Sequence, residues 1–286
     1  MTAAKSSKIQ SEPPMRTALF VSFLLSTAAL PAQDREFGTP VVTTLAQVRA
    51  EPEAYKNVKV TFKVQFTSLG RITNPFFTKF TPTDFANFYA WADEQPIWQE
   101  KSYNDVFGML FLSKSHARLE ELYSLRLYQR ITVIGIIRNT FQNQPWIEVT
   151  DFEVAPGQLD TAVLTHLYRG EKLMEQRLWQ RAIAELSLAP GAGVPQPALR
   201  AVHKNLGVCL LRMGEAQAAI GYLESATQLG NGQDMEIENL IAMAKSQPEQ
   251  AIDRTVDSRG LKESERPMWE AFDGDKGRRP ASKLTR

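Results

Sequence analysis

The sequence predicts an α+β multidomain protein in which a small β-barrel precedes an array of helical hairpins. Residues 38–157 are rich in aromatic and β-branched side chains, whereas residues 158–246 are rich in Ala, Leu, Glu and Gln. Residues 247–286 are polar and charged, with scattered Gly and Pro. These shifts in composition indicate a β domain, a helical domain and a disordered tail. Pro156-Gly157 is the expected junction between the two folded domains.

The overall composition excludes several classes of protein. The 286 residues include 33 Lys and Arg against 32 Asp and Glu, giving a net charge of +1. This balance argues against a broadly basic nucleic-acid coat and against an acidic solvating chain. The single Cys excludes an internal disulfide framework and a Cys-rich metal site. Apolar residues make up 43% of the chain, which is ordinary for a folded soluble protein.

Residues 1–32 have the features of a secretory signal peptide. Residues 17–30 are apolar or small and uncharged, Arg16 precedes them, and Ala32 closes the run. A spanning helix needs about 20 apolar residues, so a membrane anchor is the weaker alternative. Met15 is an alternative start of translation. We therefore expect an exported protein, periplasmic or secreted, with no transmembrane span after cleavage.

Five strands are predicted in the β domain. Residues 58–66 alternate strictly between apolar and polar side chains, which is typical of a half-buried strand, and a turn is expected at Ser68-Leu69-Gly70. Short helices are predicted at residues 44–54 and 115–123, and Asn143-Gln144-Pro145 is the expected turn between the last two strands. The other four predicted strands are residues 85–92, 106–112, 131–137 and 146–154.

Three strands, a helix and two strands follow one another in the order of the oligonucleotide/oligosaccharide-binding (OB) fold. The segment also resembles OB-type domains that open with a spaced pattern of apolar residues, Pro and Tyr. The matching positions are Leu45, Val48, Pro52, Tyr55, Val58, Val60 and Val64. The resemblance implies a five-stranded barrel, and such barrels often stack bases on aromatic side chains. The candidate ligand face consists of Phe76, Phe77, Phe80, Phe88 and Trp91.

The charge of the β domain argues against a nucleic-acid ligand. Between residues 39 and 157 the acidic and basic side chains are equal in number, whereas phosphate binding needs a net positive face. An exported protein also rarely meets nucleic acid. The alternative ligands of the barrel are thus a small molecule, an oligosaccharide or, disfavoured by this charge balance, a nucleic acid. The alternative interpretation is that the aromatic side chains form the barrel core and contacts between the domains.

The helical domain contains one pattern twice. The first copy is Gly170, Leu173, Ala182, Leu186 and Ala189, and the second, 37 residues later, is Gly207, Leu210, Ala219, Leu223 and Ala226. The spacing resembles that of the tetratricopeptide (TPR) repeat, in which small residues allow close helix approach and larger ones fill the remaining space. Residues 190–197 contain three Pro and two Gly and form the predicted loop between the copies. Residues 234–245 are predicted to form a solvating end helix.

The repeat resemblance implies a protein or peptide partner that binds along the concave face of the array. The implied inward-facing residues are Leu167, Glu171, Met174 and Glu175 from the first copy and Lys204, Val208, Leu211 and Arg212 from the second. A stable stack normally needs about three repeats. One alternative is therefore that two repeats only buttress the barrel. Another is that the barrel itself is the binding module.

The sequence contains no recognisable catalytic or metal-binding pattern. His166 and His203 occupy equivalent positions of the two copies, so packing explains both, and the third histidine, His116, stands apart from them. Neither a His-Glu-x-x-His spacing nor a phosphate-binding Gly loop followed by Lys occurs. Cys209 lies in the middle of a predicted helix, where a buried, inert thiol is expected. We therefore expect a non-enzymatic interaction or scaffold protein that needs no cofactor and no metal.

Removal of the signal peptide would leave a measurable N-terminus. The exported protein should begin near Gln33, because small residues precede this position. Mass spectrometry of protein recovered outside the cytoplasm measures the first residue. Recovery of residues 16–30 intact in a membrane fraction would instead indicate an uncleaved anchor.

Overall fold

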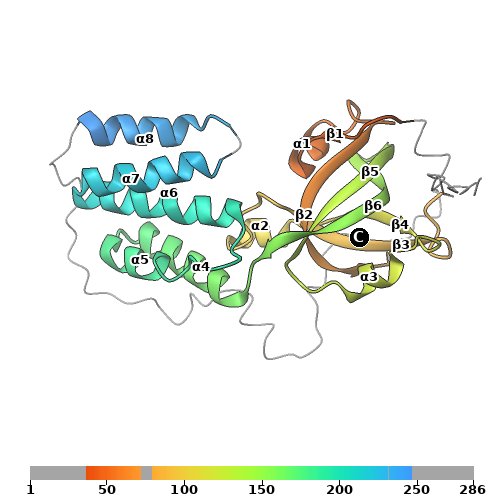
Figure 1. Ribbon diagram of the computed structural model, residues 1–286, viewed down its shortest axis with the longest axis horizontal. Coiled ribbons are helices and arrows are strands. Elements are labelled where there is room, and N and C mark those ends of the chain that lie inside the picture. Colours follow the sequence, from red (N-terminus) through yellow and green to blue (C-terminus); the bar gives the residue numbers. More distant parts are fainter. Residues whose placement is uncertain (1–36, 72–78, 231, 247–286) are drawn as a thin grey trace, which may run out of the picture. The chain divides into compact units, whose positions relative to one another are not determined.

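The computed structural model describes residues 37–71, 79–230 and 232–246. The predicted signal peptide, the predicted tail, and Phe76 and Phe77 lie outside the described residues. A six-stranded mixed sheet comes first, and a cluster of packed helices follows it in the chain (Figure 1). None of the helices in the described part of the chain is long and apolar enough to cross a membrane.

Five strands form a nearly closed ring. They are β2 (Lys59–Gly70), β3 (Phe85–Ala92), β4 (Phe107–Ser113), β5 (Gln129–Phe141) and β6 (Gln144–Gln158). Their order is β2-β3-β4-β6-β5, and β5 pairs again with β2. Neighbours are antiparallel except β4 and β6, which run parallel. The sixth strand, β1 (Val41–Val42), pairs in parallel with the start of β2.

Three short helices accompany the ring: α1 (Leu45–Ala50), α2 (Glu100–Asn104) and α3 (Leu119–Ser124). α1 begins at a capping box in which the side chain of Thr44 accepts a hydrogen bond from Gln47 N, and Gln47 Oε1 accepts one from Thr44 N. It ends four residues earlier than predicted because Pro52 disfavours helical geometry at the residue before it. All five predicted strands are present, whereas α2 and β1 were not predicted.

Two predicted turns differ from the structure. β2 continues through Gly70, and a bulge between Phe66 and Ser68 shifts its register against β3. The chain therefore bends there without leaving the sheet. The hairpin between β5 and β6 turns at Gln142 and Asn143, whose φ angles are 51° and 57°. A two-residue turn with positive φ matches the twist of the flanking strands, and the predicted turn residues 144 and 145 consequently belong to β6.

Five helices form the second part: α4 (Thr161–Glu175), α5 (Trp179–Leu186), α6 (Gln196–Met213), α7 (Ala216–Gln228) and α8 (Met235–Ser246). Each helix packs against the next in the chain, and α6 also contacts α4 and α8 (Figure 1). The carboxylate of Asp160 caps α4 by accepting a hydrogen bond from Val163 N at 2.7 Å. α8 is the predicted end helix, one residue displaced toward the C-terminus.

The helices approach each other closely in an equivalent way in the pair α4–α5 and in the pair α6–α7. A Cβ atom on Gly170 would lie 2.6 Å from Leu186 Cγ, and a Cβ atom on Gly207 would lie 2.6 Å from Leu223 Cγ. Both leucines are fully buried, so neither can move aside freely. Only glycine fits at these two positions, which are 37 residues apart. The repeated sequence pattern therefore corresponds to a repeated packing arrangement.

A second pair of equivalent contacts supports the same offset. His166 Nδ1 lies 2.9 Å from Glu185 Oε2, and this contact joins α4 to α5. In the next pair, the ring of His203 on α6 packs edge-on against Tyr222 on α7, with ring centroids 5.8 Å apart. The two contacts join equivalent positions of the two copies. Their chemistry differs, because one is an ionisable pair and the other is an aromatic pair.

The close approach at Gly207 can be tested against a matched glycine. Gly207→Ala should lower the free energy of unfolding by about 1–3 kcal/mol, because the methyl group overpacks against Leu223. Gly221 lies in the middle of α7 and is exposed, and a methyl group added there would meet no described atom within 4 Å. Gly221→Ala should therefore stabilise the protein by up to about 1 kcal/mol. Urea denaturation of both variants measures the difference. Equal effects of the two substitutions would contradict the packing described above.

Candidate functional site

The repeat-derived candidate residues divide into buried and accessible groups. Leu167 and Leu211 are 0% and 3% exposed and belong to the helical core, so they do not present a surface to a partner in this conformation. Met174 is half-buried and packs against the same core as Leu167. Glu175 is exposed and its carboxylate lies 2.8 Å from Lys172 Nζ, one turn earlier in α4. The accessible part of the candidate face is therefore smaller than the sequence pattern implies.

Glu171 is engaged by the barrel. Its carboxylate accepts hydrogen bonds from Trp98 Nε1 at 2.7 Å and from Gln99 Nε2 at 2.9 Å, both in the segment that leads into α2. Asn205 on α6 donates a third hydrogen bond through Nδ2 at 3.3 Å. A carboxylate is acceptor-only and offers about four lone-pair sites, so three donors occupy most of its capacity. Glu171 thus connects α4, α6 and the barrel.

The repeat spacing predicts that Glu171 lies on the candidate partner-binding face, but it does not identify the residues that donate hydrogen bonds to its carboxylate. Trp98 and Gln99 belong to neither the strand pattern nor the repeat pattern. The one available signal was the apolar pair Ile97-Trp98, which stands outside every predicted strand and helix. Such an isolated apolar pair needs a burial site elsewhere in the chain.

Charges on α6 are partly paired with α8 and the turn before it. Lys204 Nζ lies 2.5 Å from Glu236 Oε2, and Arg200 Nη2 lies 2.5 Å from Asp234 Oδ2. The basic residues at these two positions therefore hold the end helix against α6, although an exposed ion pair contributes at most about 1 kcal/mol. Arg212, two turns beyond Lys204, makes no hydrogen bond or ion pair with any described residue.

The open part of the helical face consists of Val208 and Arg212 on α6 and Lys245 on α8. Val208 and Arg212 are partly exposed and Lys245 is exposed. Val208 and Lys245 are 37 residues apart and occupy equivalent positions of successive first helices, as Glu171 does one repeat earlier. These three residues, which we call the α6–α8 face, combine an apolar side chain with two cations. Such a surface favours an acidic group beside an apolar one.

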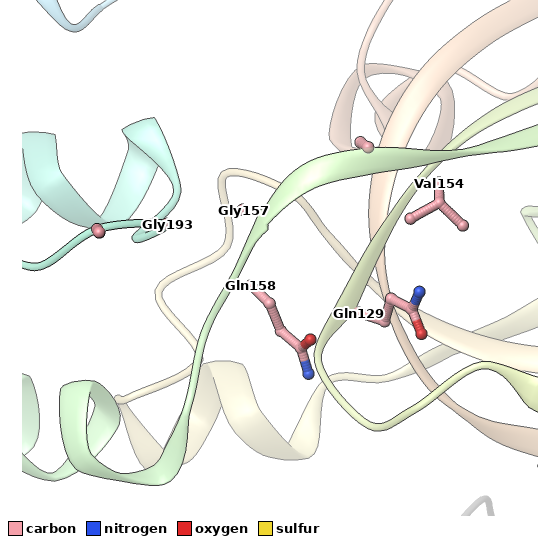
Figure 2. Close-up of a pocket in the computed structure, with 7 residues that line it drawn as sticks. Gln129, Val154, Gly157, Gln158 and Gly193 are labelled. Atoms are coloured by element: carbon pink, nitrogen blue, oxygen red, sulfur yellow. The ribbon is translucent and has the colours of Figure 1, made fainter.

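A separate open pocket of about 350 Å³ lies where β6 leaves the ring (Figure 2). Its polar side chains are amides that hold the adjacent turn. Gln129 Oε1 accepts a hydrogen bond from Arg126 N at 2.9 Å, and Gln158 Nε2 donates one to Leu127 O at 3.0 Å. The remaining lining residues are Val154, Ala155, Gly157, Ala192 and Gly193. Because these described lining residues carry no charge, the pocket offers no acid, base or counter-ion.

The described barrel aromatics do not form one ligand face. Phe88 points into the ring, and Trp91 stacks on Tyr128 in the cluster that extends to the helices, with centroids 5.6 Å apart. Phe80 stacks on Phe111 in a third cluster outside the ring, with centroids 4.4 Å apart. All three candidates are buried, at 3% exposure or less. The interpretation that these aromatic residues form core and interdomain contacts therefore fits Phe88 and Trp91. Phe76 and Phe77 lie outside the described residues.

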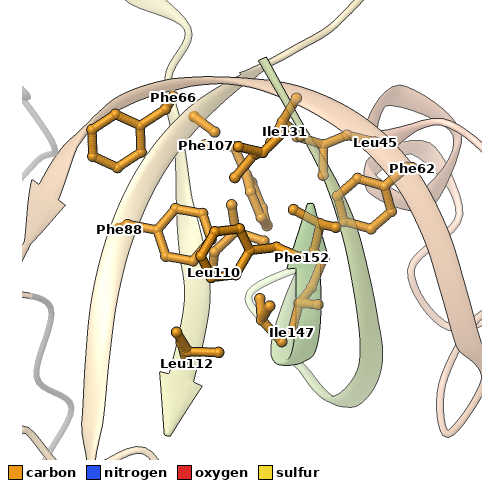
Figure 3. Packing of buried hydrophobic residues seen from close by; sticks show 14 of the residues in the cluster. Leu45, Phe62, Phe66, Phe88, Phe107, Leu110, Leu112, Ile131, Ile147 and Phe152 are labelled. Carbon is orange, nitrogen blue, oxygen red and sulfur yellow. The ribbon is translucent and has the colours of Figure 1, made fainter. Parts of the chain in front are cut away.

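The interior of the ring is filled by side chains. Figure 3 shows apolar residues from all five strands and from α1 meeting at its centre, Phe62, Phe88 and Phe152 among them. Leu45 on α1 is 0% exposed and belongs to the same cluster, so this helix covers part of the ring. A small barrel packed in this way has no room for a ligand in its lumen.

The histidines occupy packing positions. His116 Nε2 lies 3.0 Å from Thr150 O, and His116 Nδ1 accepts a hydrogen bond from Arg118 N at 3.1 Å, so the neutral ring carries its proton on Nε2. Burial lowers the pKa of His203, which favours a neutral ring there. In the part of the chain that the structure describes, His, Cys, Asp and Glu form no group of three or more that could hold a metal ion.

Cys209 should be inert in the folded protein. It is 0% exposed within the helical core, and burial raises the pKa of its thiol to about 12, so almost no reactive thiolate is present at neutral pH. A thiol reagent at pH 8 should therefore label the native protein slowly and the urea-unfolded protein rapidly. Equal labelling rates in the two states would show that the thiol is accessible.

Comparison with known proteins adds no family to this description. No protein-family model matches the chain, and no curated protein is significantly similar to it. The functional argument therefore rests on the repeated helix packing and on the groups that the helices expose.

Proposed function

We propose that this chain is a non-enzymatic binding protein that engages a protein or peptide partner through the α6–α8 face. The observation that carries the proposal is the recurrence of one helix-packing arrangement after 37 residues, at Gly170 with Leu186 and at Gly207 with Leu223. This recurrence supports a TPR-like array, and such arrays present a concave surface lined by the first helix of each pair. α4, α6 and α8 are the first helices here.

The charges of the open face favour a partner with acidic groups. Glu171 is engaged by the barrel and Lys204 is paired with Glu236, so neither is free to define the partner. Arg212 and Lys245 have no such engagement with described residues, and Val208 supplies an apolar contact. We propose that the partner places a carboxylate near Arg212 and a small apolar side chain on Val208. Export across the cytoplasmic membrane is also part of the proposal and rests on residues 17–30.

An OB-like barrel that binds a small ligand or an oligosaccharide is the second candidate. It is supported by the ring order β2-β3-β4-β6-β5, by the parallel pairing of β4 with β6, and by the position of α3 between β4 and β5. The burial of Phe80, Phe88 and Trp91 in three separate clusters weakens it. We therefore rank the helical face first.

Charge reversal tests the partner face. Arg212→Glu should abolish capture of the partner, because it places a like charge opposite the partner's acidic group, while the melting temperature should stay within a few degrees. Arg126→Glu is the matched control, since Arg126 is an exposed arginine of the barrel. Affinity capture from the extracytoplasmic fraction, compared between the two variants at equal salt, measures the effect.

Photo-crosslinking locates the same contact independently. A photoreactive residue at Val208 should crosslink to the partner, whereas one at Ala218, which is exposed on α7, should not. Capture that survives Arg212→Glu, or crosslinks that form from Ala218 alone, would count against the α6–α8 face.

A further inference from the structure

The barrel and the first helix pair share one hydrophobic core. Val163, Leu164 and Leu167 of α4 are 8% exposed or less. They belong to a single cluster of buried residues that also contains five aromatic or aliphatic residues of the barrel part. These are Trp91, Ile97, Trp98, Tyr103 and Tyr128. Because one continuous cluster crosses from the barrel to α4, removing either part would expose a large apolar surface to water.

Buried polar groups of the barrel part at this junction are hydrogen-bonded, and one of these bonds crosses to α4. A buried indole N–H needs an acceptor, and that of Trp98 finds one in Glu171 on α4. Trp91 Nε1 donates to Tyr103 O at 2.9 Å, and the hydroxyl groups of Tyr103 and Tyr128 lie 3.2 Å apart. Burial raises the pKa of Tyr103, so this hydroxyl stays protonated. The junction is therefore specific in its hydrogen bonding as well as apolar.

The segment that connects the barrel to α4 is hydrogen-bonded both to the barrel and to the loop before α6. Arg130 on β5 donates through Nη1 to Pro156 O at 2.5 Å and makes a paired hydrogen bond with Asp93 through Nε and Nη2, each at 2.6 Å. Gln158 N donates to Gly193 O in the loop before α6 at 2.9 Å. Gly157 lies between these anchors with a φ of +83°, where a side chain would be strained. Residues 155–160 thus form a rigid connection between the barrel and α4.

We propose that the barrel is the N-terminal cap of the helical stack. A stack of helix pairs leaves an apolar side open at each end and needs a cap there. α8 closes one end, with Glu238 and Asn239 on its exposed side. At the other end the barrel segment that contains Ile97, Trp98 and Gln99 shares a buried cluster with α4 and is hydrogen-bonded to Glu171. Two helix pairs therefore suffice, and the surface available to a partner begins at α6. This inference holds whether or not a partner binds there.

A double-mutant cycle tests the contact in the full chain. Trp98→Phe keeps the aromatic bulk and removes the N–H donor, and Glu171→Gln turns one acceptor atom into a competing donor. Each substitution should lower the urea midpoint, and the double variant should lower it by clearly less than the sum, because the same hydrogen bond is lost once. Glu175→Gln changes an exposed carboxylate one turn away on the same helix and should leave the midpoint unchanged.

Hydrogen exchange tests the capping role itself. In Trp98→Ala, amides of α4 to α7 should exchange more than about tenfold faster, since truncation of a buried tryptophan is among the most damaging core substitutions. If Trp98→Ala fails to fold, the same measurement on Trp98→Phe should show a smaller acceleration in the same helices. Unchanged exchange in α4 to α7, additive effects in the cycle, or separate unfolding transitions of barrel and helices would each overturn the proposal.

Discussion

The carboxylate of Glu171 joins three parts of the chain, because its donors come from Trp98 and Gln99 beside the barrel and from Asn205 on α6. The three donors come from separate segments and meet on one carboxylate, so their hydrogen bonds favour one relative placement of these segments. The apolar cluster around Trp98 supplies the burial, and the carboxylate supplies the specificity. The position of α4, and with it the direction of the whole helical cluster, depends on this junction.

The helix pairs could be predicted because their constraint is local in sequence. A glycine that must face a leucine sixteen residues later, Gly170 with Leu186 or Gly207 with Leu223, leaves a spacing that can be read without coordinates. The strands were predictable for the same reason, since alternation along residues 58–66 reports one buried face directly. Their ends were not, because the bulge after Phe66 and the two-residue turn at Gln142 depend on the partner strand.

The candidate site was predictable only in part. Repeat spacing identifies which residues share a helix face, but it cannot show that another segment already occupies that face. Glu171 is bonded to residues more than seventy positions earlier, and Lys204 to a residue thirty-two positions later. Both partners arise from tertiary packing, which periodicity does not encode. The aromatic residues of the barrel illustrate the same limit, because Phe88 and Trp91 face opposite sides of one strand and only tertiary packing shows that both sides are covered.

The occupied and open parts of the helical face have different physical character, and this difference supports a division of roles. At α4 the carboxylate of Glu171 is partly buried and accepts hydrogen bonds from three donors of the same chain, which suits a permanent contact. At α6 the groups around Val208 are accessible, and Arg212 keeps its full donor capacity with respect to the described residues. A cation without such a partner can bind an incoming carboxylate without first breaking an ion pair within the chain. The accessible groups of the proposed binding surface therefore lie on α6, whereas Glu171 on α4 is already engaged by the barrel.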